Sequence, residues 1–220
     1  MAHKIKVWDL PIRLFHWALL IAIVTSYLSV EVFEAIDTHV VSGIVVCSLL
    51  IFRIIWGFVG SPTARFWSFF PTPTKLVRYI KSSVAEKGNT VGHSPLGALS
   101  VYAMLGSLIL QAGSGLLMDD DIFTTGPLNQ FASQSLIDLA IQVHDINSGV
   151  LQVLIAMHIL AILFYLIKHK INLIGPMISG NKMVPDNESN KQAGLTHTYW
   201  IPFIAALVIS AAIGYWLFIV

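Results

Sequence analysis

Five apolar stretches, each long enough to cross a lipid bilayer, constrain the fold of this chain more than any other feature. The hydrocarbon core of a bilayer is about 30 Å thick, and a helix of about 20 apolar residues spans it. Only 11% of the 220 residues are charged, against about 25% in soluble domains. Backbone groups in lipid must bond within the segment, so each span should be a helix. The spans are predicted at about residues 12–30, 38–59, 96–118, 140–167 and 199–220.

Charge is distributed unequally between the connections. Twelve of the thirteen Lys and Arg residues fall in segments 1–13, 60–96 and 168–198, and Arg53 lies in the last two turns of the second span. Positive residues favour the cytoplasmic side, so we expect a multi-pass membrane protein with a cytoplasmic N-terminus and a C-terminus on the opposite side of the membrane. The first span reads as retained, since no cleavage pattern follows it. The connections on the opposite side contain no Lys or Arg, and their charged residues are all acidic, namely Glu31, Glu34, Asp37, Asp119, Asp120, Asp121, Asp138 and Asp145.

The long connection 60–96 contains one helical pattern. Its apolar residues at 76, 79, 80 and 84 recur at i, i+3, i+4 and i+8, which is typical of a short amphipathic helix on a membrane surface. The single cysteine, Cys47, excludes an intrachain disulfide framework and a four-cysteine metal site. No Cys-x-x-Cys-His motif occurs, so covalent c-type haem is not expected.

Four histidines fall at two levels of the predicted bundle. His144 and His158 are fourteen residues apart on the fourth span, so they share one helix face and stand roughly 21 Å apart along its axis. His39 opens the second span on the outer side, level with His144. His16 lies one turn into the first span on the inner side, level with His158. Each level therefore has one histidine from an early span and one from the fourth.

This arrangement favours metal binding. Neutral imidazole is the commonest protein metal ligand, and two imidazoles from facing helices can hold an iron porphyrin between them. Gly43 and Gly149 leave room beside the ligands, although small residues also serve helix packing. Asp145 and Asn147 are candidates to orient a ligand ring. From the residues alone, proton relay and helix–helix hydrogen bonding remain alternatives.

Several motifs resemble the prokaryotic cytochrome b561 family, in the branch that includes the b-type cytochrome subunit of nickel–iron hydrogenases. They are Val7-Trp8-Asp9-Leu10-Pro11-Ile12-Arg13-Leu14-Phe15-His16-Trp17, Arg53-Ile54-Ile55-Trp56-Gly57-Phe58, Ala64-Arg65-Phe66, Gly92-His93-Ser94-Pro95-Leu96-Gly97 and the His144/His158 pair.

The resemblance implies a four-helix core over residues 1–170 that binds two non-covalent b haems. It also implies a place in the bacterial inner membrane, so the C-terminus would lie in the periplasm. The implied axial pairs are His16 with His158 on the inner side and His39 with His144 on the outer side. His93 would contact a propionate or quinone, with an inner-ligand role as the alternative. A cytoplasmic linker, 171–198, and a fifth transmembrane helix, 199–220, would follow the core.

Two arginines are further candidates. Arg53 and Arg65 could pair with haem propionates, because a guanidinium matches a carboxylate in bidentate geometry. As an alternative, they anchor the inner side of the spans.

The expected function is electron transfer across the membrane, between quinone and an extracytoplasmic partner. Bis-histidine iron has no open position, which favours electron transfer over chemistry at the metal. Candidates to exchange the quinone's protons are His93, Asp9 and Arg53 on the inner side and Asp138 and Asp145 on the outer side. The acidic outer loops would steer a basic partner such as a c-type cytochrome.

Two other functions are open. The chain could be a haem-bearing anchor subunit of a hydrogenase or dehydrogenase, or a cofactor-free transporter that uses its histidines. Transport is disfavoured, because the spans lack acidic residues in their middles and show no inverted repeat. Lipid and quinone are the expected small partners, with no role for nucleic acid.

Overall fold

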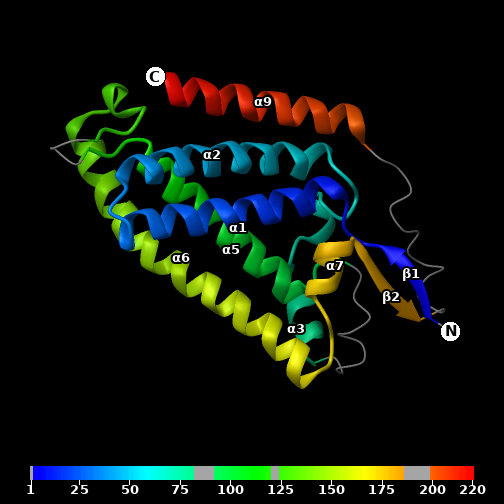
Figure 1. Ribbon diagram of the computed structural model, residues 1–220. Coiled ribbons are helices and arrows are strands. Elements are labelled where there is room, and N and C mark those ends of the chain that lie inside the picture. The colour runs from blue at the N-terminus through cyan, green and yellow to red at the C-terminus, as the bar shows by residue number, and fades with distance from the viewer. Residues whose placement is uncertain (1, 82–91, 120–123, 186–198) are drawn as a thin grey trace. The chain divides into compact units, whose positions relative to one another are not determined.

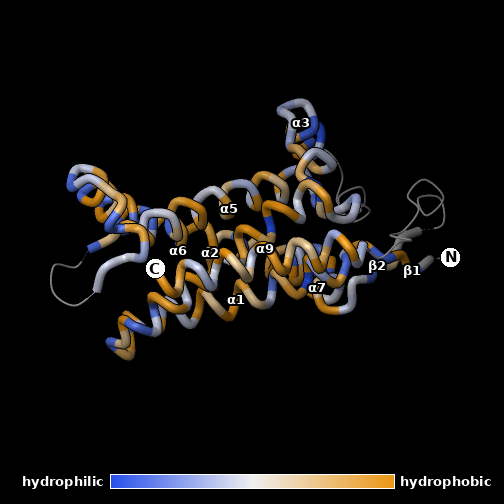
Figure 2. Tube along the Cα trace, turned by 90° about the horizontal axis from the view of Figure 1, so that it is seen from above, coloured by the Kyte–Doolittle hydropathy of each residue, from blue (hydrophilic) through white to orange (hydrophobic). Residues whose placement is uncertain are grey.

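The computed structural model describes residues 2–81, 92–119, 124–185 and 199–220. Five of its helices are long and apolar enough to cross a membrane, and hydrophobic residues run along them in Figure 2. The predicted all-α membrane fold with a fifth C-terminal helix is confirmed. The five helices are α1 (Leu10–Glu31), α2 (Ile36–Val59), α5 (Pro95–Gly115), α6 (Gln134–Lys168) and α9 (Trp200–Ile219).

Helix α6 begins six residues before the predicted span. Its first turn is capped by the backbone of Ser133, whose carbonyl accepts from the amides of residues 136 and 137. The Gln134 side chain donates to Asp138 across one turn, at 3.0 Å. Polar turns of this kind extend a helix beyond its apolar window, which a hydropathy pattern does not register.

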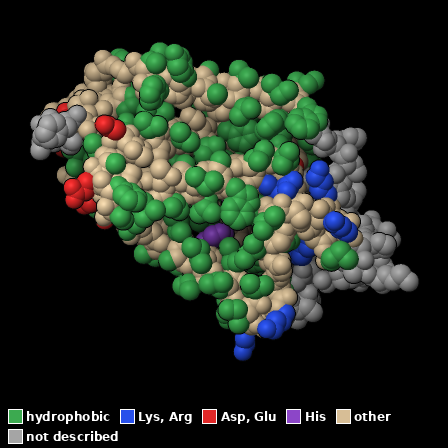
Figure 3. Space-filling view, viewed as in Figure 1, with side chains coloured by type: hydrophobic (Ala, Val, Ile, Leu, Met, Phe, Trp, Pro, Cys, Tyr) green, Lys and Arg blue, Asp and Glu red, His purple; other side chains and the backbone are tan. Residues whose placement is uncertain are grey.

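The five long helices are each divided between two compact units. Unit 1 comprises residues 1–14, 55–103 and 154–203, and unit 2 comprises residues 15–54, 104–153 and 204–220. Among the described residues, unit 1 holds ten Lys and Arg side chains and one acidic residue, whereas unit 2 holds six acidic residues and Arg53. Figure 3 shows basic side chains in blue and acidic ones in red. Residues Val84, Lys87, Asp120 and Asp121 lie outside the described ranges.

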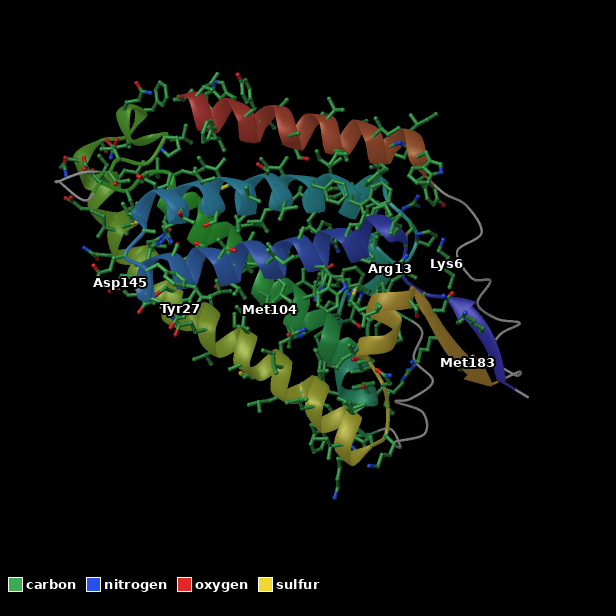
Figure 4. The ribbon with its side chains drawn as sticks, viewed as in Figure 1. Lys6, Arg13, Tyr27, Met104, Asp145 and Met183 are labelled. Atoms are coloured by element: carbon green, nitrogen blue, oxygen red, sulfur yellow. The ribbon has the colours of Figure 1, made fainter. Side chains whose placement is uncertain are left out.

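Unit 1 contains a small antiparallel sheet. Strand β1 (Ala2–Lys6) pairs with β2 (Asn181–Pro185), with Lys4 opposite Met183 (Figure 1). The short helix α7 (Ile174–Ser179) precedes β2 and ends at Gly180, whose φ of 81° favours glycine. Arg13, labelled in Figure 4, donates to the carbonyl of Ile178 at 2.5 Å. Helix α7 and strand β2 thus lie within segment 171–198.

The predicted amphipathic helix is present as α3 (Pro73–Lys81). Tyr79 is buried, and its hydroxyl lies 3.1 Å from that of Tyr165. Val77 and Ile80 are exposed, which gives the helix an apolar outer surface as well as a packed residue. An exposed apolar surface of this kind suits a helix lying in a membrane interface.

Asp9 ties the start of α1 to α2 within unit 1. Its carboxylate accepts from the amide of Ile12 at 2.7 Å, as an N-cap residue does, and from the indole N–H of Trp56 at 3.1 Å. Asp9 is 8% exposed and Trp56 is 1% exposed. Asp9 therefore serves a structural role here, beside the inner proton-exchange role predicted from the sequence.

The end of α2 is closely packed at Gly57. A Cβ added at Gly57 would overlap the ring of Phe66, so only glycine fits without rearrangement. Thr63 donates to the carbonyl of Val7 at 2.8 Å, and Arg65 donates through Nε to that of Gly60 at 2.8 Å. These contacts give residues 56–66, which include two of the motifs that carry the family resemblance, a packing function.

In unit 2, α9 packs on α2 through small side chains. Ala206, Ser210 and Gly214 recur every four residues and are buried. A Cβ at Gly214 would overlap the hydroxyl of Ser48 on α2, so the two backbones approach closely, as helices with small residues do in membranes. Figure 1 shows α9 alongside α2. The fifth helix is thus an integral part of this unit.

Candidate functional site

The site in unit 2 is built around two histidines from different helices. His39 lies in the first turn of α2 and His144 lies in the N-terminal half of α6. Their ring centroids are 6.2 Å apart, and the ring planes cross at 78°. Both side chains are half-buried. The structure therefore brings together the two histidines that the sequence placed at the outer level.

Each histidine has the same kind of partners at Nδ1. His39 Nδ1 lies 3.0 Å from the carbonyl of Ser26 and 3.1 Å from its hydroxyl. His144 Nδ1 lies 3.0 Å from the carbonyl of Gln111 and 3.2 Å from the hydroxyl of Ser114. A carbonyl only accepts, so Nδ1 must carry the hydrogen in each ring. The neutral ring then presents an unprotonated Nε2, which is the form that binds a metal.

Glycines leave space around this pair. A Cβ at Gly115 would lie 3.1 Å from Cε1 of His144, so glycine makes room for the ring. Among the described atoms, a Cβ at Gly43 or Gly149 would meet nothing within 4 Å. Gly149 is exposed, so the open space beside it is at the molecular surface, and room for a flat group beside the ligands stays a prediction.

Asn147 acts on His144 indirectly. Its side chain bonds Ser107 and Gln111 on α5, and the Gln111 amide donates to the carbonyl of His144 at 3.1 Å. Asp145 is exposed and is labelled in Figure 4. Sequence reasoning named Asn147 but missed Ser107, Gln111 and Ser114. Their i, i+4, i+7 spacing within an apolar span is the signal that predicts a shared polar face.

The predicted inner pair is divided between the units. His16 lies in unit 2, where its ring centroid is 5.3 Å from that of Trp17. His158 lies in unit 1 and is half-buried. One uninterrupted helix, α6, carries both His144 and His158, as predicted. The pairing of His16 with His158 stays a prediction.

The other candidates lie in packed surroundings. His93 lies between two aromatic rings, with centroid distances of 4.6 Å to Trp8 and 4.2 Å to Phe69. Arg65, besides its bond to the carbonyl of residue 60, lies 5.8 Å from the ring centroid of Trp67. Arg53 is 2% exposed. Their roles toward propionates or quinone stay predictions.

Comparison with known families decides the identity of the fold. Residues 7–180 match the family model described as prokaryotic cytochrome b561. The chain belongs to the prokaryotic cytochrome b561 family. This cytochrome is therefore a b-type haem protein of the membrane that transfers electrons. Strand β2 and helix α9 lie beyond the matched residues.

Two relatives of this cytochrome are both named "Probable Ni/Fe-hydrogenase B-type cytochrome subunit". The protein from Rhodobacter capsulatus is 28% identical over 131 residues, which cover 46% of this chain and 49% of the relative. The protein from Rhizobium leguminosarum bv. viciae is 23% identical over 222 residues, which cover 84% of this chain and 91% of the relative. The chain thus spans about half the length of the first relative and nine-tenths of the second. No solved structure matches the chain.

The His39–His144 pair of this cytochrome fits a haem iron. Neutral imidazole is a common ligand of haem iron, so these two rings would hold the iron of a bound haem through Nε2. Their ring centroids are 6.2 Å apart. Both rings also have Nδ1 satisfied, which leaves Nε2 for the metal. The donor set therefore suits bis-imidazole ligation.

Proposed function

We propose that this cytochrome binds two b haems and carries electrons across the cytoplasmic membrane, between the quinone pool and an extracytoplasmic redox partner. The observation that carries the proposal is the His39–His144 pair, with 6.2 Å between ring centroids and a carbonyl partner at each Nδ1. A bound haem supplies one-electron oxidation and reduction at its iron. His39 and His144 would hold the outer haem, and His16 and His158 the inner one.

The protein's own part would be to hold both ligand rings in place. The carbonyls of Ser26 and Gln111 hold the two rings by Nδ1, so neither imidazole is free to turn away. Ligation of the iron by two histidines would favour electron transfer over chemistry at the metal. Hydrogen bonding at Nδ1 would also raise the donor strength of each ligand and so lower the potential of a bound haem iron.

The charge distribution supports the orientation. Unit 1 holds ten of the eleven described Lys and Arg side chains, and unit 2 holds six of the seven described acidic ones. By the positive-inside rule, the N-terminal strand and α3 would face the cytoplasm, and the loop ahead of α2 would face the periplasm. Cysteine labelling at introduced residues Lys75→Cys and Glu34→Cys in intact cells tests this, since only Glu34→Cys should react with an impermeant reagent.

A pocket in unit 2 is a candidate quinone site. It has a volume of about 430 Å³, within the usual range of about 300–1,000 Å³ for small-molecule sites. Val40 and Val41, which directly follow His39, form part of its wall, and Thr125 and Gln130 offer a hydroxyl and an amide. A quinone ring needs such hydrogen-bonding groups among apolar walls. The remaining lining residues are Ile44, Gly126, Pro127, Asn129, Leu217, Phe218 and Val220.

Reduction of the haem by a soluble quinol analogue tests both the function and the pocket. Wild-type protein in detergent, mixed with the quinol in a stopped-flow instrument, should show reduced b-haem bands. Val41→Trp should slow this reduction at least tenfold by filling the pocket. Val45→Trp is the matched control, because Val45 has the same 44% exposure on α2 and does not line the pocket.

The outcomes test the quinone function and the choice of pocket separately. If the wild-type haem is reduced by dithionite but not by quinols of any chain length, the quinone role is wrong. If Val41→Trp and Val45→Trp both react at the wild-type rate, the quinone role stands and the pocket is the wrong site.

A second candidate function is that of a haem-bearing anchor subunit of a hydrogenase. Both relatives are named as hydrogenase cytochrome subunits, which favours this role. Co-purification of a hydrogenase from mildly solubilised membranes would support this role.

For a basic soluble partner steered by the acidic loops, the association rate should fall as salt is raised, and a rate that is flat with ionic strength would contradict such steering.

A further inference from the structure

A buried polar network joins α5 to α6 next to His144. Asn147 is 8% exposed, and its amide donates to the carbonyl of Ser107 at 3.0 Å and to Oε1 of Gln111 at 2.7 Å. Its Oδ1 accepts from the Ser107 hydroxyl at 2.9 Å. Buried polar groups in apolar helices are costly unless they are bonded, and here both hydrogens and the oxygen of the Asn147 amide have partners.

The network fixes the orientation of Gln111. Because Oε1 of Gln111 accepts from Asn147, its Nε2 faces the opposite way and donates to the carbonyl of His144 at 3.1 Å. The main-chain carbonyl of Gln111 also accepts from Nδ1 of His144 at 3.0 Å. One residue of α5 therefore holds both the backbone and the ring of His144.

The partner ring is held differently. Ser26 on α1 supplies both contacts of His39 Nδ1, through its carbonyl and its hydroxyl. The two rings are thus fixed by separate helices, α1 and α5, neither of which supplies an outer ligand. The angle between the ring planes, 78°, follows from how these two helices hold them.

We propose that Ser107, Gln111 and Asn147 are positioning residues that keep the His144 ring nearly perpendicular to the His39 ring at the haem iron. The proposal rests on the ligation proposed above. Iron has two d orbitals that can accept π donation from axial imidazoles. Two imidazoles in parallel planes act on the same one of these orbitals and separate the two orbital energies, whereas imidazoles in perpendicular planes act on both orbitals equally. Perpendicular ligands therefore give ferric low-spin haem a strongly anisotropic electron paramagnetic resonance (EPR) signal, and hydrogen bonding at Nδ1 tunes its potential.

Low-temperature EPR spectra of the oxidised protein test the proposal. The wild type should show a strongly anisotropic low-spin signal from the outer haem. Asn147→Leu removes the bonds to Ser107 and Gln111 at similar volume, so this signal should move to a smaller maximal g value. The midpoint potential of the same haem should rise. Gln142→Leu is the matched control, because Gln142 is exposed on the same helix.

Ser107→Ala provides a smaller change if Asn147→Leu fails to assemble. It removes the hydroxyl that donates to Asn147 and leaves the carbonyl in place, so the same EPR shift should appear in weaker form. Ser107→Thr keeps a hydroxyl and should restore most of the wild-type signal. A wild-type spectrum and potential in both Asn147→Leu and Ser107→Ala, with haem bound, would overturn the proposal.

His144→Ala separates this result from a failure of the ligation. If the anisotropic signal survives in His144→Ala, then His144 is not the ligand and the site itself is wrong. If the signal is lost there but stays unchanged in Asn147→Leu, the ligation stands and the positioning role is refuted.

Discussion

Removal of the Asp9 carboxylate should destabilise this cytochrome strongly. Asp9→Ala removes the N-cap bond to the amide of Ile12 and the acceptor of the Trp56 indole. Loss of an N-cap costs about 0.5–2 kcal/mol, and a hydrogen bond to a charged group contributes about 1.5–3 kcal/mol. We therefore expect a loss of about 2–5 kcal/mol in the free energy of unfolding.

A double-mutant cycle isolates the bond to the indole. Unfolding would be measured in mixed micelles for the wild type, Asp9→Ala, Trp56→Phe and the double variant. Since both single changes break the same bond, the double variant should be less destabilised than their sum by about 1.5–3 kcal/mol. Asp145→Ala, at an exposed position, should stay within about 0.5 kcal/mol of the wild type.

The refuting results are specific. Additive effects of Asp9→Ala and Trp56→Phe would show that the 3.1 Å contact contributes nothing. A stable Asp9→Ala variant would show that α1 needs no cap at this residue. If Asp9→Asn keeps the fold but abolishes quinol reduction, the proton-exchange role predicted from the sequence would gain support over the structural one.

Two glycine positions give further tests. Gly57→Ala should lower stability by about 1–3 kcal/mol through overpacking, because its Cβ would overlap the ring of Phe66; an unchanged unfolding midpoint would contradict this packing. Gly115→Val should displace the His144 ring, from which a Cβ is 3.1 Å away, and should lower the outer-haem content measured after extraction. Gly113→Val is its control, since a Cβ there meets no described atom within 4 Å, and equal haem loss in both variants would argue against a local effect.

The sequence was sufficient to predict the five spans and the facing of His39 and His144. Hydropathy is a local signal, so each span is readable in isolation. The histidine pair followed from helix periodicity, which places His144 relative to His158 on α6, and from orientation, which places His39 at the outer side. Neither inference required knowledge of side-chain packing.

Other features depend on contacts between distant residues, which no local pattern fixes. Strand β1 pairs with β2 across more than 170 residues, and the sequence of neither segment predicts which segment it pairs with. Asp9 was read as a candidate proton group because its contact with Trp56 could not be foreseen. Gln111 was missed because an amide within an apolar span indicates a polar contact without saying which helix supplies it.

The central claim is that His39 and His144 hold a b haem, and haem counting tests it most directly. Wild-type protein and the variants His39→Ala and His144→Ala would be purified in detergent, and haem per chain would be measured by extraction together with reduced-minus-oxidised spectra. The account predicts two haems per wild-type chain and the loss of the same one in both variants. Wild-type haem content and an unchanged spectrum in either variant would contradict it.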